Sequence, residues 1–269
     1  MFKKIVTRYR YSAILLKQLV ITDFKLRYQG SVLGYVWSLL KPMALFVILY
    51  IVFTKFLKIG ADIPHYPVYL LLGIVLWNYF AESTSGSIGS IVGKGDLIRK
   101  INFPKYVIVM ASSFSALINL FLNFIVIAVF MVVSGVDISK YVILLPLIIL
   151  ELFILSLSLG FILSTAFVRY RDISHIWEVV LQGLFYATPI LYPISLLPSK
   201  AAKFVILNPM AQIIQDARFV LVSPQTQTIS SIFTNRPWIR IIPLLSVVVC
   251  AVVAVVYFKK RSKYFAEEV

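Results

Sequence analysis

The sequence predicts an all-α integral membrane protein of about six transmembrane helices, on the grounds of its composition and the lengths of its apolar blocks. Of 269 residues, 60% are hydrophobic and only 14% are charged. A soluble domain of this size needs more polar side chains to cover its surface. The apolar residues also come in blocks near the ~20 residues that a helix needs to cross a bilayer. A single helical bundle in a membrane is therefore expected.

The N-terminal segment is basic and then apolar, but Lys17 and Asp23 interrupt its apolar stretch and no small-residue cleavage site follows. It is therefore not expected to be a removable signal peptide. Residues 12–30 instead predict an amphipathic helix in the membrane interface, because polar residues recur at helical spacing in an apolar segment. Asp23 and Arg27 stand four residues apart, where they either pair with each other or face a partner. The polar residues of the stripe are Gln18, Thr22, Lys25 and Gln29.

Apolar blocks of suitable length predict the spanning helices. The third and fourth are long enough to tilt or to project beyond the membrane. Near the end of the fifth, Pro189 and Pro193 each remove a backbone donor, so the helix is expected to break there. The polar backbone exposed by the break needs protein or a water-filled cavity around it, which suggests an exit. The predicted spans are 37–56, 67–87, 106–133, 141–168, 177–196 and 241–258.

The longest connection, residues 197–240, is expected on the outer side and contains a further helix. Asn208 and Pro209 are typical of an N-cap followed by the first helical turn. Apolar residues then recur with helical spacing, which predicts an amphipathic helix on the outer face. These apolar residues are Met210, Ile213, Ile214, Ala217 and Leu221.

The basic residues predict the orientation in the membrane. Of the 26 lysines and arginines, 18 fall in the segments on the side of the termini and 8 on the other side. Because cytoplasmic loops carry the excess of positive charge, both termini are expected in the cytoplasm. The net charge of +15 is then mostly a topological signal, and binding of nucleic acid is not expected.

The sequence offers no machinery for hydrolysing ATP or for catalysis. GSIVGKG at 89–95 has too few residues between its glycines for a phosphate-binding loop, so Gly89 and Gly93 are better explained as small residues that let helices approach closely. The outer carboxylates Asp62, Asp137 and Asp216 are too scattered for a glycosyltransferase or metal site. Cys250 is the one cysteine, so no disulfide forms within the chain. The chain is expected to be no enzyme and to hold no cofactor or metal.

Two carboxylates fall inside predicted spans. An ionised group at mid-bilayer costs at least ~2.5–3.5 kcal/mol and tends to face the bundle interior. Glu82 and Glu151 are therefore candidates for a substrate path. The alternative is that Glu82 lies near the headgroups and that Glu151 is protonated or hydrogen-bonded in helix packing.

Aromatic residues give a second candidate for the path. Phe46, Tyr50 and Phe53 share one face of the first predicted span, where their rings could stack on sugars that slide past. Against this, aromatic stripes often pack helices together or anchor them at the interface. Phe185 and Tyr192, beside the prolines of the fifth span, are the next candidates.

Five segments closely resemble signature stretches of the ABC-2-type export permeases, in the family's order and spacing. They are DFKLRYQGSVLGYVWSLLKP at 23–42, LIRKINFPK at 97–105, YRDI at 170–173, TPILYP at 188–193 and LNPM at 207–210. The family includes permeases for O-antigen, capsular polysaccharide and wall teichoic acid. The resemblance implies export of a lipid-linked glycan or polyol-phosphate polymer across the bacterial inner membrane.

The resemblance also implies a homodimer of six-helix subunits, each paired with a separate ATP-binding subunit that holds ATP and Mg²⁺. Residues 12–30 would be a gate helix, and residues 94–105 would contain a coupling helix docked on the ATPase, unless that segment is only a basic topogenic loop. Alternative functions are the export of a smaller amphiphile, such as a drug or lipid, and a membrane anchor for a glycan-synthesis complex. The coupling residues would be Asp96, Leu97, Ile98, Arg99, Ile101 and Phe103.

Overall fold

The computed structural model describes residues 2–28, 31, 33–58, 63–101, 103–137, 139–234 and 236–268, and over these residues every regular element is helical. The predicted all-α fold is therefore confirmed. The helices are α1 Phe2–Tyr28, α2 Trp37–Tyr50 with a π-helical continuation Ile51–Phe56, α3 Tyr66–Ile88, α4 Gly95–Lys100, α5 Tyr106–Val133, α6 Leu145–Arg169, α7 Ile173–Ala187, α8 Ser199–Val205, α9 Pro209–Leu221, α10 Ile229–Ile232, α11 Ile241–Arg261 and α12 Phe265–Glu268.

Four helical segments in the described part of the chain are long and apolar enough to cross a membrane. They are Trp37–Phe56, Tyr106–Val133, Lys140–Arg169 and Trp238–Arg261. The other two predicted spans correspond to α3, which is more polar, and α7, which is shorter. Helix α3 has 23 residues but carries Asn78, Glu82 and several hydroxyl groups, and α7 has 15 residues and ends at Ala187, just before the prolines.

Helix α3 lies at the centre of the bundle, although it is less apolar than its neighbours α2, α5, α6 and α7. It packs against α2, α5, α6, α7 and α9 and is buried over most of its length. The outer helices instead expose branched apolar side chains, such as Val132 at 82% and Ile143 at 81% exposure. This distribution is expected in a bilayer, where lipid contacts the most apolar surface and polar side chains find partners between helices.

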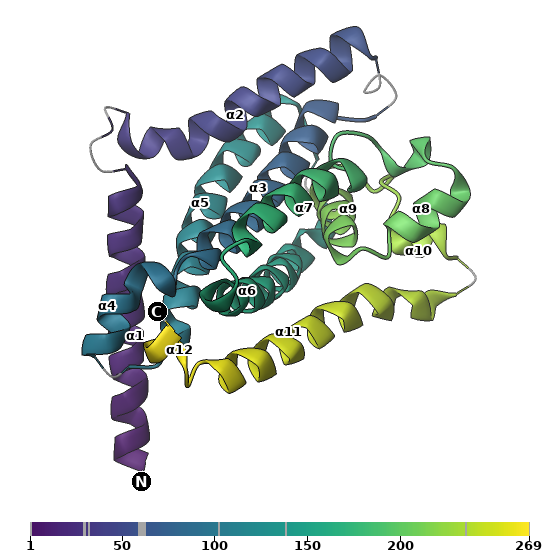
Figure 1. Ribbon diagram of the computed structural model, residues 1–269. Helices are drawn as coiled ribbons and strands as arrows, with labels where there is room; N and C mark the ends of the chain where they lie inside the picture. Colours follow the sequence, from purple (N-terminus) through teal and green to yellow (C-terminus); the bar gives the residue numbers. More distant parts are fainter. Residues whose placement is uncertain are drawn as a thin grey trace.

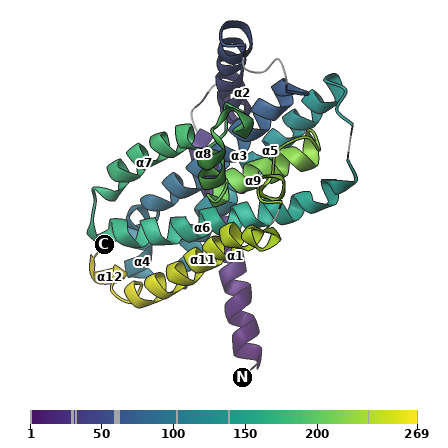
Figure 2. The same cartoon turned by 90° about the vertical axis from the view of Figure 1, so that its right-hand side faces the viewer.

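The bundle has two distinct ends (Figure 1). Helices α4 and α12 lie together at one end, which α1 crosses, and α8, α9 and α10 gather at the opposite end. We refer to these as the α4–α12 end and the α8–α10 end. Helix α1 packs against α5 and extends past the bundle on one side, as both views show (Figures 1 and 2). Its helix covers Phe2–Tyr28 and thus begins ten residues before the predicted segment 12–30.

Small residues bring α3 close to its neighbours. A Cβ added at Gly86 would lie 2.7 Å from Ser112 Oγ on α5, and one at Gly160 on α6 would lie 2.7 Å from Ser87 Oγ. Gly89 and Gly93 were expected to have this role, and that prediction was wrong. Both of those have open space around them, because they follow the end of α3, beyond its contacts with α5 and α6.

Helix α9 begins as its sequence predicts, but it does not lie on the outer surface. Asn208 Oδ1 accepts a hydrogen bond from the Met210 amide at 3.0 Å, the expected N-cap. The helix packs against α3, α6 and α11, and most of its side chains are buried, including polar ones such as Gln215. Its apolar face is covered by the protein's own helices, so it is part of the core at the α8–α10 end.

Arg218 of α9 satisfies the backbone at the break that follows α7. Its side chain is fully buried, and its guanidinium donates to Pro189 O at 2.6 Å, to Ile190 O at 2.6 Å and to Tyr69 O at 3.1 Å. The guanidinium carbon also lies 3.6 Å from the centre of the Tyr69 ring. The polar backbone of the break is therefore paired with protein, and this pairing joins α3, α9 and the break into one unit.

Candidate functional site

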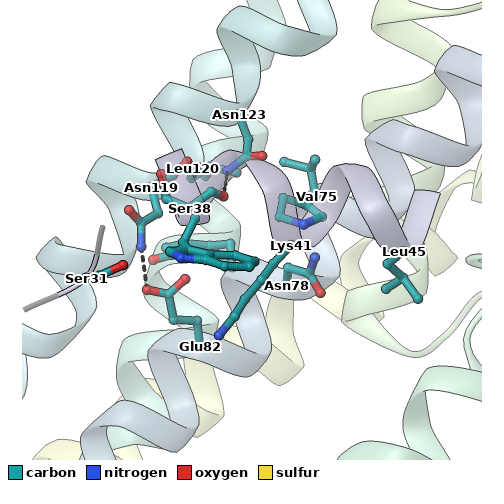
Figure 3. Close-up of a pocket in the computed structure, with 13 residues that line it drawn as sticks. Ser31, Ser38, Lys41, Leu45, Val75, Asn78, Glu82, Asn119, Leu120 and Asn123 are labelled. Atoms are coloured by element: carbon teal, nitrogen blue, oxygen red, sulfur yellow. Dashed lines mark hydrogen bonds between the residues drawn. The ribbon is translucent and has the colours of Figure 1, made fainter. Parts of the chain in front are cut away.

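A cavity of about 730 Å³ lies between α2, α3 and α5 (Figure 3). Its walls come from the first half of α2, the second half of α3 and the middle of α5, so it lies toward the α4–α12 end. Polar residues make up much of the wall, which is unusual inside an apolar bundle. The lining residues are Ser31, Trp37, Ser38, Lys41, Pro42, Leu45, Val75, Asn78, Tyr79, Glu82, Asn119, Leu120 and Asn123.

Hydrogen bonds hold the polar side chains of the cavity in place. Asn119 Nδ2 donates to Glu82 Oε1 at 2.7 Å, which orients the carboxylate (Figure 3). One turn further along α5, Asn123 Nδ2 donates to Asn119 O at 2.8 Å and to Ser38 O at 3.3 Å, so it joins α5 to α2. Fixed side chains cost less entropy when a ligand binds, and this favours recognition at the wall.

The cavity combines three kinds of chemistry. Asn78 adds an amide, which both donates and accepts hydrogen bonds, and Glu82 offers carboxylate acceptors. Trp37 supplies an indole, whose flat apolar body suits the C–H face of a sugar ring. Lys41, one helical turn after Trp37, is exposed and offers a cation to a phosphate group. Together they suit a polyhydroxylated ligand that carries a phosphate.

Of the predicted path residues, Glu82 is the one that lines this cavity. The aromatic stripe does not. Phe46 is 4% exposed and meets Phe130 of α5 edge-on, with 5.4 Å between ring centroids, while Tyr50 stacks on Phe46 at 5.7 Å. Tyr50 and Phe53 are partly buried against the same core. The stripe packs α2 onto α5, the alternative that the sequence left open.

Phe185 and Tyr192 lie near the break after α7, away from the cavity wall. The Phe185 ring contacts Trp77 of α3 edge-on at 5.7 Å. Tyr192 Oη donates to Tyr186 O at 3.0 Å. Glu151 lines a separate polar groove at the α8–α10 end with Gln212 and Asp216. The structure therefore divides the predicted path residues among four places.

The predicted coupling segment has one face buried in this chain and one face exposed. Ile98 and Phe103 are buried in a small core with Phe258 and Phe265 of the C-terminal region. Leu97 is partly buried against the same core. Ile98 and Phe103 therefore anchor this segment to the bundle. The exposed residues are Asp96, Arg99, Lys100 and Ile101.

The predicted gate helix is tied to that segment by an ion pair. Asp23 of α1 accepts from Lys94 Nζ through both carboxylate oxygens, at 2.9 and 2.8 Å. Asp23 is therefore paired across elements, and the side chain of Arg27 lies outside the described residues. The stripe residues Gln18, Thr22 and Lys25 are exposed, as expected for a polar face.

Sequence reasoning missed most of the cavity. Asn119 and Asn123 stand four residues apart in the 28-residue apolar helix α5, a spacing that could have identified them as a polar face inside a membrane. Trp37 and Lys41 were part of a signature stretch but were given no role. Asn78 had no local signal, since its place depends on how α2 and α5 cover α3.

Comparisons with known proteins agree on one family. Residues 14–222 match the family described as ABC-2 type transporter. The O-antigen export system permease protein RfbA of Myxococcus xanthus is 31% identical over 207 residues, which are 76% of this chain and 78% of that protein. A protein of the same name from Klebsiella pneumoniae is 30% identical over 246 residues, 91% of each. The polysialic acid transport protein KpsM of Escherichia coli is 22% identical over 210 residues, 76% of this chain and 80% of that protein.

Proposed function

Because the chain belongs to the ABC-2 type transporter family, we propose that it is the membrane-spanning subunit of an exporter that moves a lipid-linked polysaccharide out of a bacterial cell. The names of its relatives, permeases for O-antigen and polysialic acid, support this substrate class. Energy comes from a separate ATP-binding subunit, as the lack of a phosphate-binding loop in the sequence suggests.

The observation that carries the proposal is the polar cavity between α2, α3 and α5. Buried polar groups in a membrane bundle are costly and mark pathways for polar cargo. A sugar chain needs hydrogen-bonding partners along its route, since its hydroxyl groups lose water when they enter the protein. The amide, carboxylate and indole groups of this cavity supply such partners, and Lys41 suits the phosphate of a lipid linkage.

The proposed assembly is a homodimer in which the polymer path runs between two copies of this chain. Helices α2, α3, α5, α6, α7 and α11 each run between the two ends of the bundle (Figure 1) and would form six crossings, with α3 buried among the other helices and α7 exposed over most of its length. The basic residues favour a cytoplasmic α4–α12 end in the inner membrane, and therefore cytoplasmic termini.

The exposed face of α4 is the proposed contact for the ATP-binding subunit. The pair between Asp23 and Lys94 connects this region to α1, so a displacement of α4 would also move the predicted gate helix. Glu82 lies close to where substrate would enter from that side. The substrate entrance near Glu82, the predicted gate helix α1 and the ATPase contact on α4 would thus lie close together at the α4–α12 end.

The proposal is tested by blocking the cavity. Asn78→Trp adds a large ring at the wall, so surface polymer should fall at least tenfold in cells that make the variant at normal levels. Ile125→Trp, on the exposed face of α5, is the matched control and should leave export unchanged. If a folded Asn78→Trp exporter delivers undiminished polymer, the cavity is not on the path.

A further inference from the structure

A second polar cavity, of about 630 Å³, lies at the α8–α10 end between α6, α9 and residues 224–231. It shares no lining residue with the cavity between α2, α3 and α5. Its residues have no part in the proposed route through the cavity near Glu82. We refer to it as the outer groove.

The base of the outer groove holds carboxyl and amide groups with unused hydrogen-bonding capacity. Gln212 is 9% exposed, and its Nε2 donates to Asp216 Oδ2 at 2.6 Å. Its Oε1 is buried and lacks a hydrogen-bonding partner among the described residues, and the same holds for Glu151 Oε1. Buried acceptors without donors are rare in folded proteins and mark places where a ligand or water supplies the donor.

The rim of the outer groove is built from amides and hydroxyls. Residues 224–231 form most of it, and Gln225 and Gln227 are exposed. On the opposite side, Phe219 of α9 contributes an aromatic ring, which packs near Tyr141 with 5.4 Å between centroids. A carboxylate and amide base beside an aromatic ring and a hydroxyl-rich rim is suited to a ligand with many hydroxyl groups.

The charges of the outer groove narrow the class of ligand. Glu151 and Asp216 line the base, and Arg240 at the rim donates to Ser230 Oγ. Among the described lining residues there are two carboxylates, one arginine and no lysine, so carboxylates outnumber cations. This balance disfavours a phosphate-rich chain, because like charges repel in a partly desolvated groove. A metal ion is also disfavoured, since the described residues hold no group of three or more candidate ligands.

We propose that the outer groove binds sugar residues of the exported polymer, through Glu151 and Gln212, and that this polymer is a neutral or amino-sugar glycan rather than a polyol phosphate. The inference rests on the proposed export function and adds to it a binding site for the glycan and the charge class of its sugars. Sugars held at the α8–α10 end would be kept from sliding back while the next repeat enters.

The test uses the full exporter with its ATP-binding subunit in lipid nanodiscs. The probes are oligosaccharides released from the polymer that the source cells display and, separately, a glycerol-phosphate oligomer. Saturation-transfer NMR should show contact with the oligosaccharides and at least fivefold less with the glycerol-phosphate oligomer. An equal or stronger signal from the phosphate oligomer would overturn the proposed substrate class.

Two kinds of variant locate the contact. Gln212→Met keeps the side-chain length without its polar atoms and should reduce the oligosaccharide signal at least fivefold. Gln212→Met also removes the hydrogen-bonding partner of Asp216. The rim variant Gln225→Ala/Gln227→Ala leaves the base of the groove intact and therefore tests the site independently. It should reduce the oligosaccharide signal at least twofold. If neither variant changes the signal, the outer groove is not the site.

The cavity variant separates this inference from the proposed function. Asn78→Trp should stop export but keep the oligosaccharide signal of the outer groove. Loss of that signal in Asn78→Trp would place the sugars in the cavity between α2, α3 and α5 and would refute the outer-groove site alone. Undiminished export by Asn78→Trp would instead refute the proposed path, whatever happens in the outer groove.

Discussion

At the scale of single residues, Arg218 is the side chain on which the α8–α10 end depends most. It is fully buried and donates to three backbone carbonyls from two separate parts of the chain. The planar guanidinium has five N–H donors in a fixed arrangement, which a lysine cannot reproduce. Gly73 makes room for it, since a Cβ there would lie 2.5 Å from Arg218 Nη2.

Arg218→Met should therefore destabilise the protein strongly. The carbonyls of Tyr69, Pro189 and Ile190 would lose their donor, and each orphaned buried acceptor costs about 1–3 kcal/mol. We expect a loss of at least about 3 kcal/mol and a fall in Tm of roughly 5–10 °C, measured on purified protein in detergent. Arg218→Lys should recover only part of this loss.

Arg236→Met is the matched control, because Arg236 is exposed at the same end of the molecule. Its Tm should stay within about 2 °C of the unchanged protein, as for most surface substitutions. A Tm for Arg218→Met as high as that of the control would show that water replaces the guanidinium without loss.

The sequence did not reveal the role of Arg218. From the sequence, Arg218 was one of the eight basic residues assigned to the outer loops, because a charge between two spans is normally solvated. Burial depends on the meeting of α3, α9 and the break after α7, which are far apart in sequence. The N-cap at Asn208, in contrast, was predictable, since it depends on two neighbouring residues alone.

At the scale of elements, the ion pair between Asp23 and Lys94 joins α1 to the α4 region, beside the apolar contacts that Leu15 and Leu19 make there. Both side chains are about one quarter exposed, so the pair contributes no more than about 1 kcal/mol to stability. In the proposed exporter, the pair would transmit movement between α1 and the α4 region. Reversing one charge should thus affect transport more than folding.

We expect Asp23→Lys to reduce surface polymer at least threefold, because the α1 charge then repels Lys94. The double variant Asp23→Lys/Lys94→Asp should recover most of the export, since the opposite charges can meet again at the same place. Polymer is measured on cells with equal amounts of exporter. Lys25→Glu, an exposed charge change on the same helix, should have little effect.

If the double variant exports no better than Asp23→Lys alone, the two side chains act separately and the pair carries no coupling. If Lys25→Glu is as harmful as Asp23→Lys, the total charge of α1 matters rather than this contact.

Element lengths were predicted well where apolar blocks are continuous and less well where proline or polar residues intervene. Helix α5 has the predicted bounds, since 28 residues without a charge favour one helix. The fifth span was extended past its prolines, whereas α7 ends at Ala187. The aromatic residues of α2 share one face of the helix, as predicted, but this face packs against Phe130 of α5. Helical spacing alone does not identify the partner that a face contacts.

At the scale of the whole molecule, the two ends of the bundle differ in charge and in structure, and this gives a prediction of topology. We expect cysteines at Ser31 and Lys263 to be labelled only from the cytoplasm and one at Gln225 only from outside, in a Cys250→Ser background. All three positions are exposed. The reason is the excess of basic residues at the α4–α12 end.

The measurement is labelling of intact cells with a membrane-impermeant maleimide, before and after permeabilisation. Labelling of Lys263→Cys but not of Ser31→Cys in intact cells would contradict the cytoplasmic placement of the C-terminus and with it an even number of crossings. Labelling of all three positions in intact cells would point to damaged membranes and is checked with a cytoplasmic marker protein.

The fold class followed from composition, because no soluble bundle carries so much apolar surface. The cavity between α2, α3 and α5 could not be found in the same way. Its polar residues are separated by up to 92 positions, from Ser31 to Asn123, and each looked ordinary in its own segment. Only Glu82 stood out, because a carboxylate in an apolar block is conspicuous by itself.

The pairing of the break with Arg218 also constrains how the chain is made. Pro189 and Ile190 are synthesised 29 and 28 residues before their donor. Until α9 has emerged from the ribosome, their carbonyls need water or the insertion machinery as a temporary partner, because lipid offers no donor. Insertion of α7 therefore cannot be completed when α7 itself is finished. The α8–α10 end is assembled after synthesis has passed Arg218, and a nascent chain shorter than that would present an incomplete helix end to cellular quality control.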